Sequence, residues 1–461
     1  MIDTVLTQAT QNQDDALNRL MDLLRIPSVS TDPAHAPDCR RAADWVADHL
    51  RGSGLTAEVL ETGGHPAVVA KAPDDLVAKP TAPRVIFYGH YDVQPPDPLD
   101  LWKSPAFEPV IRDGRDGPAV FARGACDDKG QIMMFLEALR AYHDAGQKLP
   151  GPVTVLIEGE EEHGSKNLPA FLEREKNRLA GDVVLISDTS MWKPGLPAIC
   201  TALRGLVYFD LKLQGPKVDL HSGVYGGTTA NPANILTRVL GQLFDDDNRI
   251  NIPGFYDDVA EVTPEEKAAW AKLDFKENDY FGAIGGAAYG EKGLDTLTRR
   301  WARPSCDING LKSGYIGEGA KTVLPAVAGA KVSFRIPAAM NPAKVARQFE
   351  DWLRARDVGP CTWDIQCLSK AGSVATPTDS PFIEAASRAV IKTTGNPPAL
   401  VREGATIPVV ADFKRLLGLD AVLLGFGLET DAIHSPNEHF GVERFRLGTR
   451  THAALLAEVT K

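Results

Sequence analysis

Cysteine is scarce in this sequence of 461 residues, and its placement excludes two common structural roles. The chain contains no Cys-x-x-Cys pair, and its six cysteines are scattered at Cys39, Cys126, Cys200, Cys306, Cys361 and Cys367. This spacing argues against a disulfide framework and against a zinc–cysteine cage. A reducing cytoplasm is therefore the expected location.

Long apolar runs and an excess of positive charge are also absent. No stretch approaches the roughly 20 apolar residues that span a bilayer, and the N-terminus lacks the basic segment and apolar run of a secretory signal. The formal net charge is -11 at pH 7, whereas nucleic acids and anionic membranes select basic surfaces. We therefore expect neither as a partner, although an acidic chain is compatible with bound metal cations.

The first part of the chain alternates strand and helix signals. Short apolar runs at 67–71, 85–88, 153–158 and 182–187 are typical of buried strands, and helical patterns lie between the last three of them. This alternation predicts an α/β fold with a largely parallel sheet and helices on both faces.

The pattern changes near Gly205. Alternating strands such as LVYFDLKLQG and AKVSFRIPA appear there, together with a helical pattern at 232–244 and a long irregular stretch from about 245 to 321. The α/β pattern resumes after Thr376. Because the length already suggests two domains, we expect a catalytic domain built from residues 1–204 and 377–461 and an inserted α+β lid domain at 205–376.

Histidines and acids follow the ends of several apolar strands. They lie in VIFYGHYDVQ (His90, Asp92), GACDDKGQ (Asp127, Asp128), VLIEGEEEHGS (Glu158, Glu160, Glu161, Glu162, His163), VVLISDTS (Asp188) and AIHSPNEHF (His434). In open α/β sheets, ligands bind outside the carboxyl ends of the strands. Solvated loop acids explain Glu158 or Glu160 well, but they explain isolated acids at several strand ends poorly.

This combination of residue types indicates a metal hydrolase. Imidazole and carboxylate ligands suit zinc or manganese, and a two-metal site needs a bridging carboxylate plus an unligated carboxylate that accepts the proton of a shared water. Adjacent glutamates can supply one ligand and one base. The chain has no Gly-x-Ser-x-Gly elbow and no His-Glu-x-x-His helix, and GYIGEGAKT has Ala320 where a phosphate loop needs glycine.

The motifs GHYDVQPP, RGACDDKG, EGEEEHGS, DLHSG and AIHSPNE occur in the order typical of one family. Together they resemble the aminoacylase/carboxypeptidase family of co-catalytic zinc peptidases, nearest to its cytosolic nonspecific dipeptidase, or carnosinase-like, branch. The resemblance covers nearly the whole chain. It implies two divalent ions per chain, zinc first and manganese or cobalt as alternatives, with ligands assigned as follows: His90 and Asp188 for one ion, Glu162 and His434 for the other, and Asp127 bridging both.

The resemblance also implies roles outside the ligand set. Asp92 would orient His90, Glu161 would be the general base, and the peptide between Asp127 and Asp128 would be cis. The lid domain would form a homodimer and lend His221 to the neighbouring active site, while the substrate would contact Thr322, Arg335, Gly404 and Thr406. Two departures from the family pattern, His163 after the glutamate pair and Ala405-Thr406 in place of glycine-serine, affect side-chain preference more than chemistry.

The expected activity is hydrolysis of dipeptides or short peptides with a free C-terminal carboxylate, by a metal-bridged hydroxide. An N-acyl- or related amino-acid amidohydrolase would use the same water activation and differ only in pocket contacts. A catalytically silent dimeric binding protein is the alternative from another class. The sequence does not distinguish the preferred substrate, the native metal or the location of the His221 contact.

Overall fold

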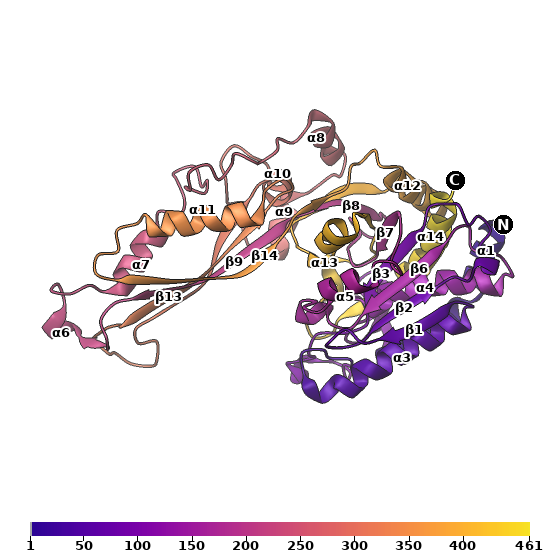
Figure 1. Ribbon diagram of the computed structural model, residues 1–461, viewed down its shortest axis with the longest axis horizontal. Coiled ribbons are helices and arrows are strands. Elements are labelled where there is room, and N and C mark those ends of the chain that lie inside the picture. The colour runs from indigo at the N-terminus through magenta and orange to yellow at the C-terminus, as the bar shows by residue number, and fades with distance from the viewer. Residues whose placement is uncertain (1) are drawn as a thin grey trace. The chain divides into compact units, whose positions relative to one another are not determined.

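The computed structural model describes residues 2–461, and the packing of their backbone divides the chain into two compact units (Figure 1). Unit 1 comprises Met1–Thr201, Thr376–Val401 and Asp412–Lys461, and unit 2 comprises Ala202–Ala375 and Arg402–Ala411. The short segment Arg402–Ala411 packs with unit 2, although the sequence-based division placed it in the last part of the catalytic domain. That functional division at 204/205 and 376/377 stays a prediction.

Unit 1 is built on a mixed sheet with the strand order β1-β2-β6-β3-β7-β17-β8, and β16 also pairs with β8. The strands are β1 (Thr56–Leu60), β2 (Ala67–Lys71), β3 (Val85–His90), β6 (Val153–Glu158), β7 (Val183–Ile186), β8 (Ala198–Leu203), β16 (Ala399–Glu403) and β17 (Asp420–Leu423). In the centre, β3 is parallel to β6 and β7, and β7 is parallel to β17. The predicted α/β class with a largely parallel sheet is confirmed.

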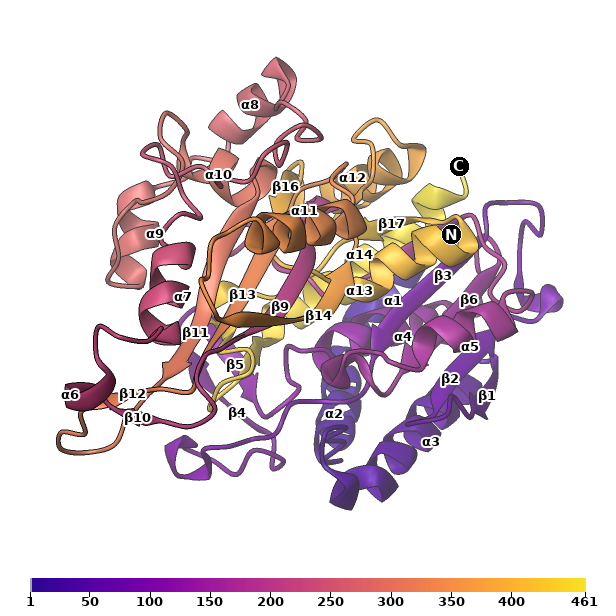
Figure 2. The same ribbon diagram turned by 60° about the vertical axis from the view of Figure 1, so that its left-hand side comes forward.

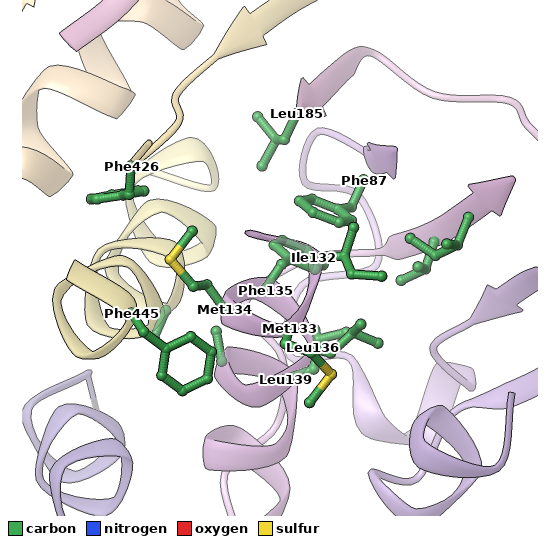
Figure 3. Close-up of a cluster of buried hydrophobic side chains, with 14 of the residues drawn as sticks. Phe87, Ile132, Met133, Met134, Phe135, Leu136, Leu139, Leu185, Phe426 and Phe445 are labelled. Carbon is green, nitrogen blue, oxygen red and sulfur yellow. The ribbon is translucent and has the colours of Figure 1, made fainter. Parts of the chain in front are cut away.

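Helices cover this sheet and provide its core. They are α1 (Ile2–Gln11), α2 (Gln13–Leu24), α3 (Ala36–Gly52), α4 (Lys129–Asp144), α5 (Leu168–Glu175), α12 (Pro381–Thr394) and α14 (Val442–Val459). Every residue of β3 and β6 is buried, as expected for strands with covered faces. Figure 3 shows Phe87 of β3 against Phe135 of α4, with the ring centroids 3.9 Å apart, and Phe445 of α14 beside Met134.

A small sheet with the order β18-β5-β4 adjoins the start of α4 in sequence. Its strands are β4 (Val110–Gly114), β5 (Gly117–Phe121) and β18 (His439–Gly441). The antiparallel pairing of β18 with β5 brings the C-terminal segment beside residues that precede Asp127. Among the described residues, no helix is both long enough and apolar enough to cross a membrane.

Unit 2 contains an antiparallel sheet with the order β11-β13-β9-β14 and a separate ribbon of β10 and β12. The strands of this sheet and ribbon are β9 (Gly205–Gln214), β10 (Leu220–His221), β11 (Ser305–Ser313), β12 (Val323–Leu324), β13 (Val327–Ile336) and β14 (Thr362–Ala371). The short strand β15 (Val374–Ala375) pairs instead with β8, through Leu203 and Ala202. Burial alternates along β9, because one face packs on α7 (Pro232–Leu240) and α11 (Pro342–Arg354). Phe209, Phe334 and Phe349 meet edge-on in that core.

The stretch 245–321 is more ordered than the sequence indicated. It contains β11 and three short helices, α8 (Pro264–Ala271), α9 (Glu277–Ala283) and α10 (Thr296–Ala302). The prediction of an irregular stretch was wrong because α8, α9 and α10 are too short to show a helical period and β11 shows little alternation of burial. A capping box between Thr263 and Glu266 begins α8, and the Asp295 carboxylate accepts a hydrogen bond from the Thr298 amide at the start of α10. The remaining helices are α6 (Ser222–Tyr225) and α13 (Pro408–Asp412).

Candidate metal centre

The carboxyl ends of the central parallel strands of unit 1 carry the predicted ligands. His90 is the last residue of β3, and Glu162 lies in the short helical turn Glu161–His163 that follows β6. Asp188 follows β7, and Asp127 lies two residues before the first residue of α4. His434 comes from the loop after β17. Parallel neighbours end at the same edge, which is why residues distant in sequence meet here.

These residues form two groups that share Asp127. His90, Asp127 and Asp188 have ligand atoms within 4.8 Å of one another, and so do Asp127, Glu162 and His434. The two oxygens of Asp127 face different histidines: Oδ1 is 3.2 Å from Nε2 of His90, and Oδ2 is 2.9 Å from Nε2 of His434. Glu162 adds a second carboxylate oxygen near His434: its Oε2 lies 3.2 Å from Nε2 of that histidine.

The donor set fits divalent cations. Nε2 of His90 is buried and has no well-directed hydrogen-bond partner among residues 2–461, although carboxylates from Asp127 and Asp188 lie 3.2 and 4.0 Å away. A buried polar atom without a partner is costly unless something satisfies it. An imidazole nitrogen and converging carboxylate oxygens are ligands that Zn²⁺ accepts.

The electrostatics of the centre agree with a site for cations. Burial and the neighbouring Asp127 raise the pKa of Asp188 to about 7, and burial raises the pKa of Glu161 well above its usual range. The carboxylates of Asp127 and Glu162, which accept hydrogen bonds from the imidazole, raise the pKa of His434 to about 10. Buried carboxyl groups close to other carboxylates resist losing their protons, because their negative charges repel one another. A divalent cation bound between them would reduce this repulsion.

Asp92 links the two ends of the centre. Nδ1 of His90 lies 3.1 Å from the backbone oxygen of Asp92 and 3.3 Å from its carboxylate Oδ1. The same carboxylate accepts hydrogen bonds from the backbone amides of Glu161 at 3.2 Å and Glu162 at 3.0 Å. Asp92 is fully buried, so it fixes the imidazole and the glutamate turn relative to each other.

Asp128, which the sequence placed beside Asp127, accepts a hydrogen bond at Oδ2 from the His90 amide, and the peptide between Asp127 and Asp128 is cis, as the resemblance implied. Two further residues at the centre, Gln94 and Glu438, were not singled out from the sequence. Gln94 Nε2 donates to Glu162 Oε2 at 2.8 Å. Glu438 accepts hydrogen bonds from the loop before Asp127. Gln94 lies within GHYDVQPP and Glu438 within AIHSPNEHF, so their motifs pointed to the right segments without revealing the contacts.

Within unit 2, the predicted substrate residues fall into two separate groups. His221 is the last residue of β10 and Thr322 directly precedes β12, and the backbone amide of Ser222 donates to the Thr322 carbonyl at 3.1 Å. The amide of Gly223 donates to Nδ1 of His221 at 3.0 Å, which leaves the ring proton on Nε2.

The second group lies at the other end of β13 (Figure 2). Arg335 donates from Nη1 to the Thr406 hydroxyl at 2.7 Å, and that hydroxyl donates to the Arg204 carbonyl at 2.6 Å. Nε of Arg204 donates to the Gly404 carbonyl at 3.0 Å. Arg204 therefore holds the turn that supports Arg335, a role that its sequence context did not indicate.

An α/β sheet whose carboxyl edge carries two overlapping histidine–carboxylate groups is the arrangement of a metal-dependent hydrolase. Residues 86–458 match the model of peptidase family M20/M25/M40, and the chain belongs to this family. This membership confirms the expected class, a metallopeptidase, and the resemblance on which that expectation rested.

Sequence alignments with two dipeptidases cover almost the whole chain. The Cys-Gly metallodipeptidase dug1 of Schizosaccharomyces pombe is 30% identical over 476 residues, covering 99% of this chain and 98% of the relative. The Beta-Ala-His dipeptidase of Homo sapiens is 30% identical over 482 residues, covering 100% and 93%.

Solved structures show the same fold. The di-peptidase Dug1p from Saccharomyces cerevisiae aligns with a TM-score of 0.83 at 28% identity, covering 100% of this chain and 98% of that chain. The M20 family metallo-carboxypeptidase Sso-CP2 from Sulfolobus solfataricus aligns with a TM-score of 0.84 at 29% identity, covering 96% and 99%.

Proposed function

We propose that this protein hydrolyses dipeptides or short peptides with a free C-terminal carboxylate, using two divalent metal ions per chain. Zn²⁺ is the proposed metal, with Mn²⁺ or Co²⁺ as alternatives. One observation carries the proposal: Asp127 directs its two carboxylate oxygens toward two different histidines, His90 and His434, as a carboxylate shared by two ions must. The names of the relatives, Cys-Gly metallodipeptidase and Beta-Ala-His dipeptidase, support dipeptides as the substrate class.

In this proposal the two groups of the centre each hold one ion. His90 and Asp188 would hold the first, Glu162 and His434 would hold the second, and Asp127 would be shared, in agreement with the two groups that could bind a cation. When bound, the two ions would polarise the peptide carbonyl and lower the pKa of a shared water. Asp92 keeps the Nδ1 proton of His90 engaged, so that the Nε2 lone pair faces the ligand position.

Glu161 is the proposed general base. It adjoins the proposed ligand Glu162, and its backbone amide donates to the Asp92 carboxylate, which holds the turn that carries it. The charges of His90, Asp188 and Asp127 act on its carboxyl group, which supports a position near the centre. Burial raises the pKa of this carboxyl well above its usual range, which favours its accepting a proton. The same group would then donate that proton to the leaving amine of the peptide.

Arg335 is the proposed partner of the substrate carboxylate. Among the described residues, no carboxylate forms an ion pair with it, and the Thr406 hydroxyl accepts a hydrogen bond from one of its nitrogens, so the planar guanidinium is oriented before substrate binds. Gly404 belongs to the same turn, whose carbonyl is held by Arg204.

His221 and Thr322 lie too far from Arg335 for one small peptide to touch both groups within a chain. Val327 and Arg335 are eight residues apart on β13, which at about 3.3 Å per residue is roughly 26 Å, and the ribbon with His221 lies beyond Val327. We therefore propose a homodimer through the inserted domain in which His221 of one chain serves the site of the other. We also propose a reducing cytoplasm as the location, because the six cysteines are scattered along the sequence and include no Cys-x-x-Cys pair.

The proposal is tested with a substrate panel. Purified protein is stripped of metal, reloaded with Zn²⁺, Mn²⁺ or Co²⁺, and given dipeptides, the same dipeptides with an amidated C-terminus, and N-acyl amino acids. We expect turnover of the free dipeptides and little turnover of the amidated controls, because the amide cannot pair with a guanidinium. Faster turnover of N-acyl amino acids would indicate the amidohydrolase instead, and two bound ions without any turnover would refute an enzymatic role.

A further inference from the structure

A buried carboxylate lies directly beneath the loop that carries Asp127. The side chain of Glu438 is fully buried and accepts four hydrogen bonds. Its Oε2 accepts from Nη1 of Arg123 at 2.7 Å and from the backbone amide of Gly124 at 2.9 Å. Its Oε1 accepts from the backbone amides of Cys126 at 2.9 Å and Asp127 at 3.0 Å. One carboxylate thus accepts hydrogen bonds from three backbone amides of this loop and from one guanidinium.

Stability alone is a weak explanation for this arrangement. Removing a carboxylate and a guanidinium from water costs several kcal/mol per ion, and well-packed apolar residues often stabilise a core as well or better. What such a pair does provide is a defined backbone path for the loop. Gly124 has φ = +81°, and a side chain there would meet Val93 at 2.6 Å, so the loop is held in a conformation that a side chain would oppose.

The hydrogen bond from the Asp127 amide to Glu438 fixes the backbone of Asp127, the residue that the two groups of the centre share. Its backbone amide is bound by Glu438, while its two side-chain oxygens reach His90 and His434. Ligand groups generally need to be held within about 0.5 Å of their productive position. A loop that shifted by more than this would favour one histidine over the other.

Glu438 also belongs to the segment that supplies His434. It lies four residues further on, its carbonyl accepts a hydrogen bond from the Ala122 amide at 3.1 Å, and β18 begins at the next residue and pairs with β5 through His439 and Phe121. The side chain therefore ties the loop of one ligand to the segment of another.

We propose that Glu438 is a positioning residue for the metal centre: it sets the loop of Asp127 against the segment of His434 so that both metal positions form together. This inference rests on the proposed function, in which Asp127 is shared by two ions. The competing explanation is that Glu438 only neutralises the buried Arg123, which is 1% exposed and also donates to the Pro95 carbonyl.

The test compares two buried glutamates that each pair with an arginine. In Glu438→Gln the amide has the shape of the carboxylate but turns one acceptor into a donor, so two of the four donors face an N–H group in either orientation. The control is Glu137→Gln, because Glu137 is 3% exposed and accepts from Nε and Nη2 of Arg19 at 2.7 and 2.6 Å, with no contact to the proposed ligands.

Metal-free, full-length protein is titrated with Zn²⁺ against a chelating dye, and the visible spectrum is recorded after loading with Co²⁺. Loss of an outer partner of a metal ligand typically costs 10–100-fold in affinity, so we expect Glu438→Gln to bind Zn²⁺ at least about tenfold more weakly and to show an altered Co²⁺ spectrum. Glu137→Gln should keep both the wild-type affinity and the wild-type spectrum, even if its melting temperature falls by a similar amount.

Wild-type affinity and spectrum in Glu438→Gln would overturn the inference, and so would equal losses in the control. If Glu438→Gln does not fold, Glu438→Asp is measured instead, because its shorter carboxylate cannot reach all four donors, and the same criteria apply. Asp127→Asn separates the two levels of the argument. If that variant retains two tightly bound ions, the proposed ligand set fails; if it loses metal while Glu438→Gln does not, only the positioning role fails.

Discussion

His452 of α14 should make the fold of unit 1 sensitive to mild acid. The imidazole is 1% exposed and lies edge-on to the rings of Phe87, Phe135 and Phe426, with centroid distances of 6.0, 5.6 and 5.9 Å. Its Nε2 is 3.2 Å from the hydroxyl of Ser187. Protonation would place a full charge among three aromatic rings.

The hydrogen bonds define which nitrogen carries the proton of the neutral ring. The Ser187 hydroxyl donates to the Leu424 carbonyl at 3.1 Å, so its oxygen accepts the proton from Nε2 of His452. Nδ1 has no hydrogen-bond partner among the described residues. A second proton would therefore create a buried N–H group without an acceptor, which adds to the cost of burying the charge.

The size of the loss of stability follows from the change in the pKa of His452 on folding. Burial lowers the pKa of His452 from 6.5 to about 3. Between these values the unfolded chain binds more protons than the folded chain, so this contribution to stability is complete above about pH 6.5 and falls as the pH falls. At about 1.4 kcal/mol per pKa unit, the loss is about 2 kcal/mol at pH 5 and approaches about 5 kcal/mol below pH 3.

The assay is urea unfolding of wild type and His452→Gln at pH 8 and pH 5, followed by tryptophan fluorescence. Glutamine can keep the hydrogen bond to Ser187 but does not titrate, so the difference between the two proteins cancels the titration of all other groups. Wild type should lose about 2 kcal/mol more than the variant between the two pH values. Equal losses would refute the assignment of His452 as a buried neutral imidazole.

Four further outcomes test the proposed site. Asp127→Asn should release at least one ion per chain, as measured by elemental analysis, and full retention would contradict the shared-ligand assignment. Glu161→Gln should keep its metal but lose about 10²–10⁴ in kcat, since an amide accepts no proton; near-normal kcat would exclude this base. Thr406→Val should raise KM for free-carboxylate dipeptides, because it removes the hydroxyl that orients Arg335, whereas Thr406→Ser keeps that hydroxyl and should leave KM unchanged. Equal KM values for the two variants would exclude a role of the hydroxyl in orienting Arg335. His221→Ala should remain folded and metal-loaded but lose about 10²–10³ in turnover, and mixed dimers with Glu161→Ala chains should regain activity; verified mixed dimers that stay inactive would rule out action across the interface.

Elements that depend on local patterns were predictable from the sequence. The strands at Ala67–Lys71 and Val153–Glu158 have the bounds that their apolar runs indicated. By contrast, β11 shows little alternation of burial, so its sequence carries no strand period, and the capped helix α8 is too short to show a helical one. These elements had to be seen in the structure.

The sequence by itself determined which residue types stand at the strand ends, and thereby the class of chemistry, because strand periodicity and motif order are properties of short segments. Only the tertiary structure decided how Asp127 divides its oxygens between His90 and His434, and that Glu438 holds its loop. Arg123 and Glu438 are 315 residues apart in the chain. No local pattern encodes a contact over that separation, since it exists only after β5, β18 and the central sheet have folded together.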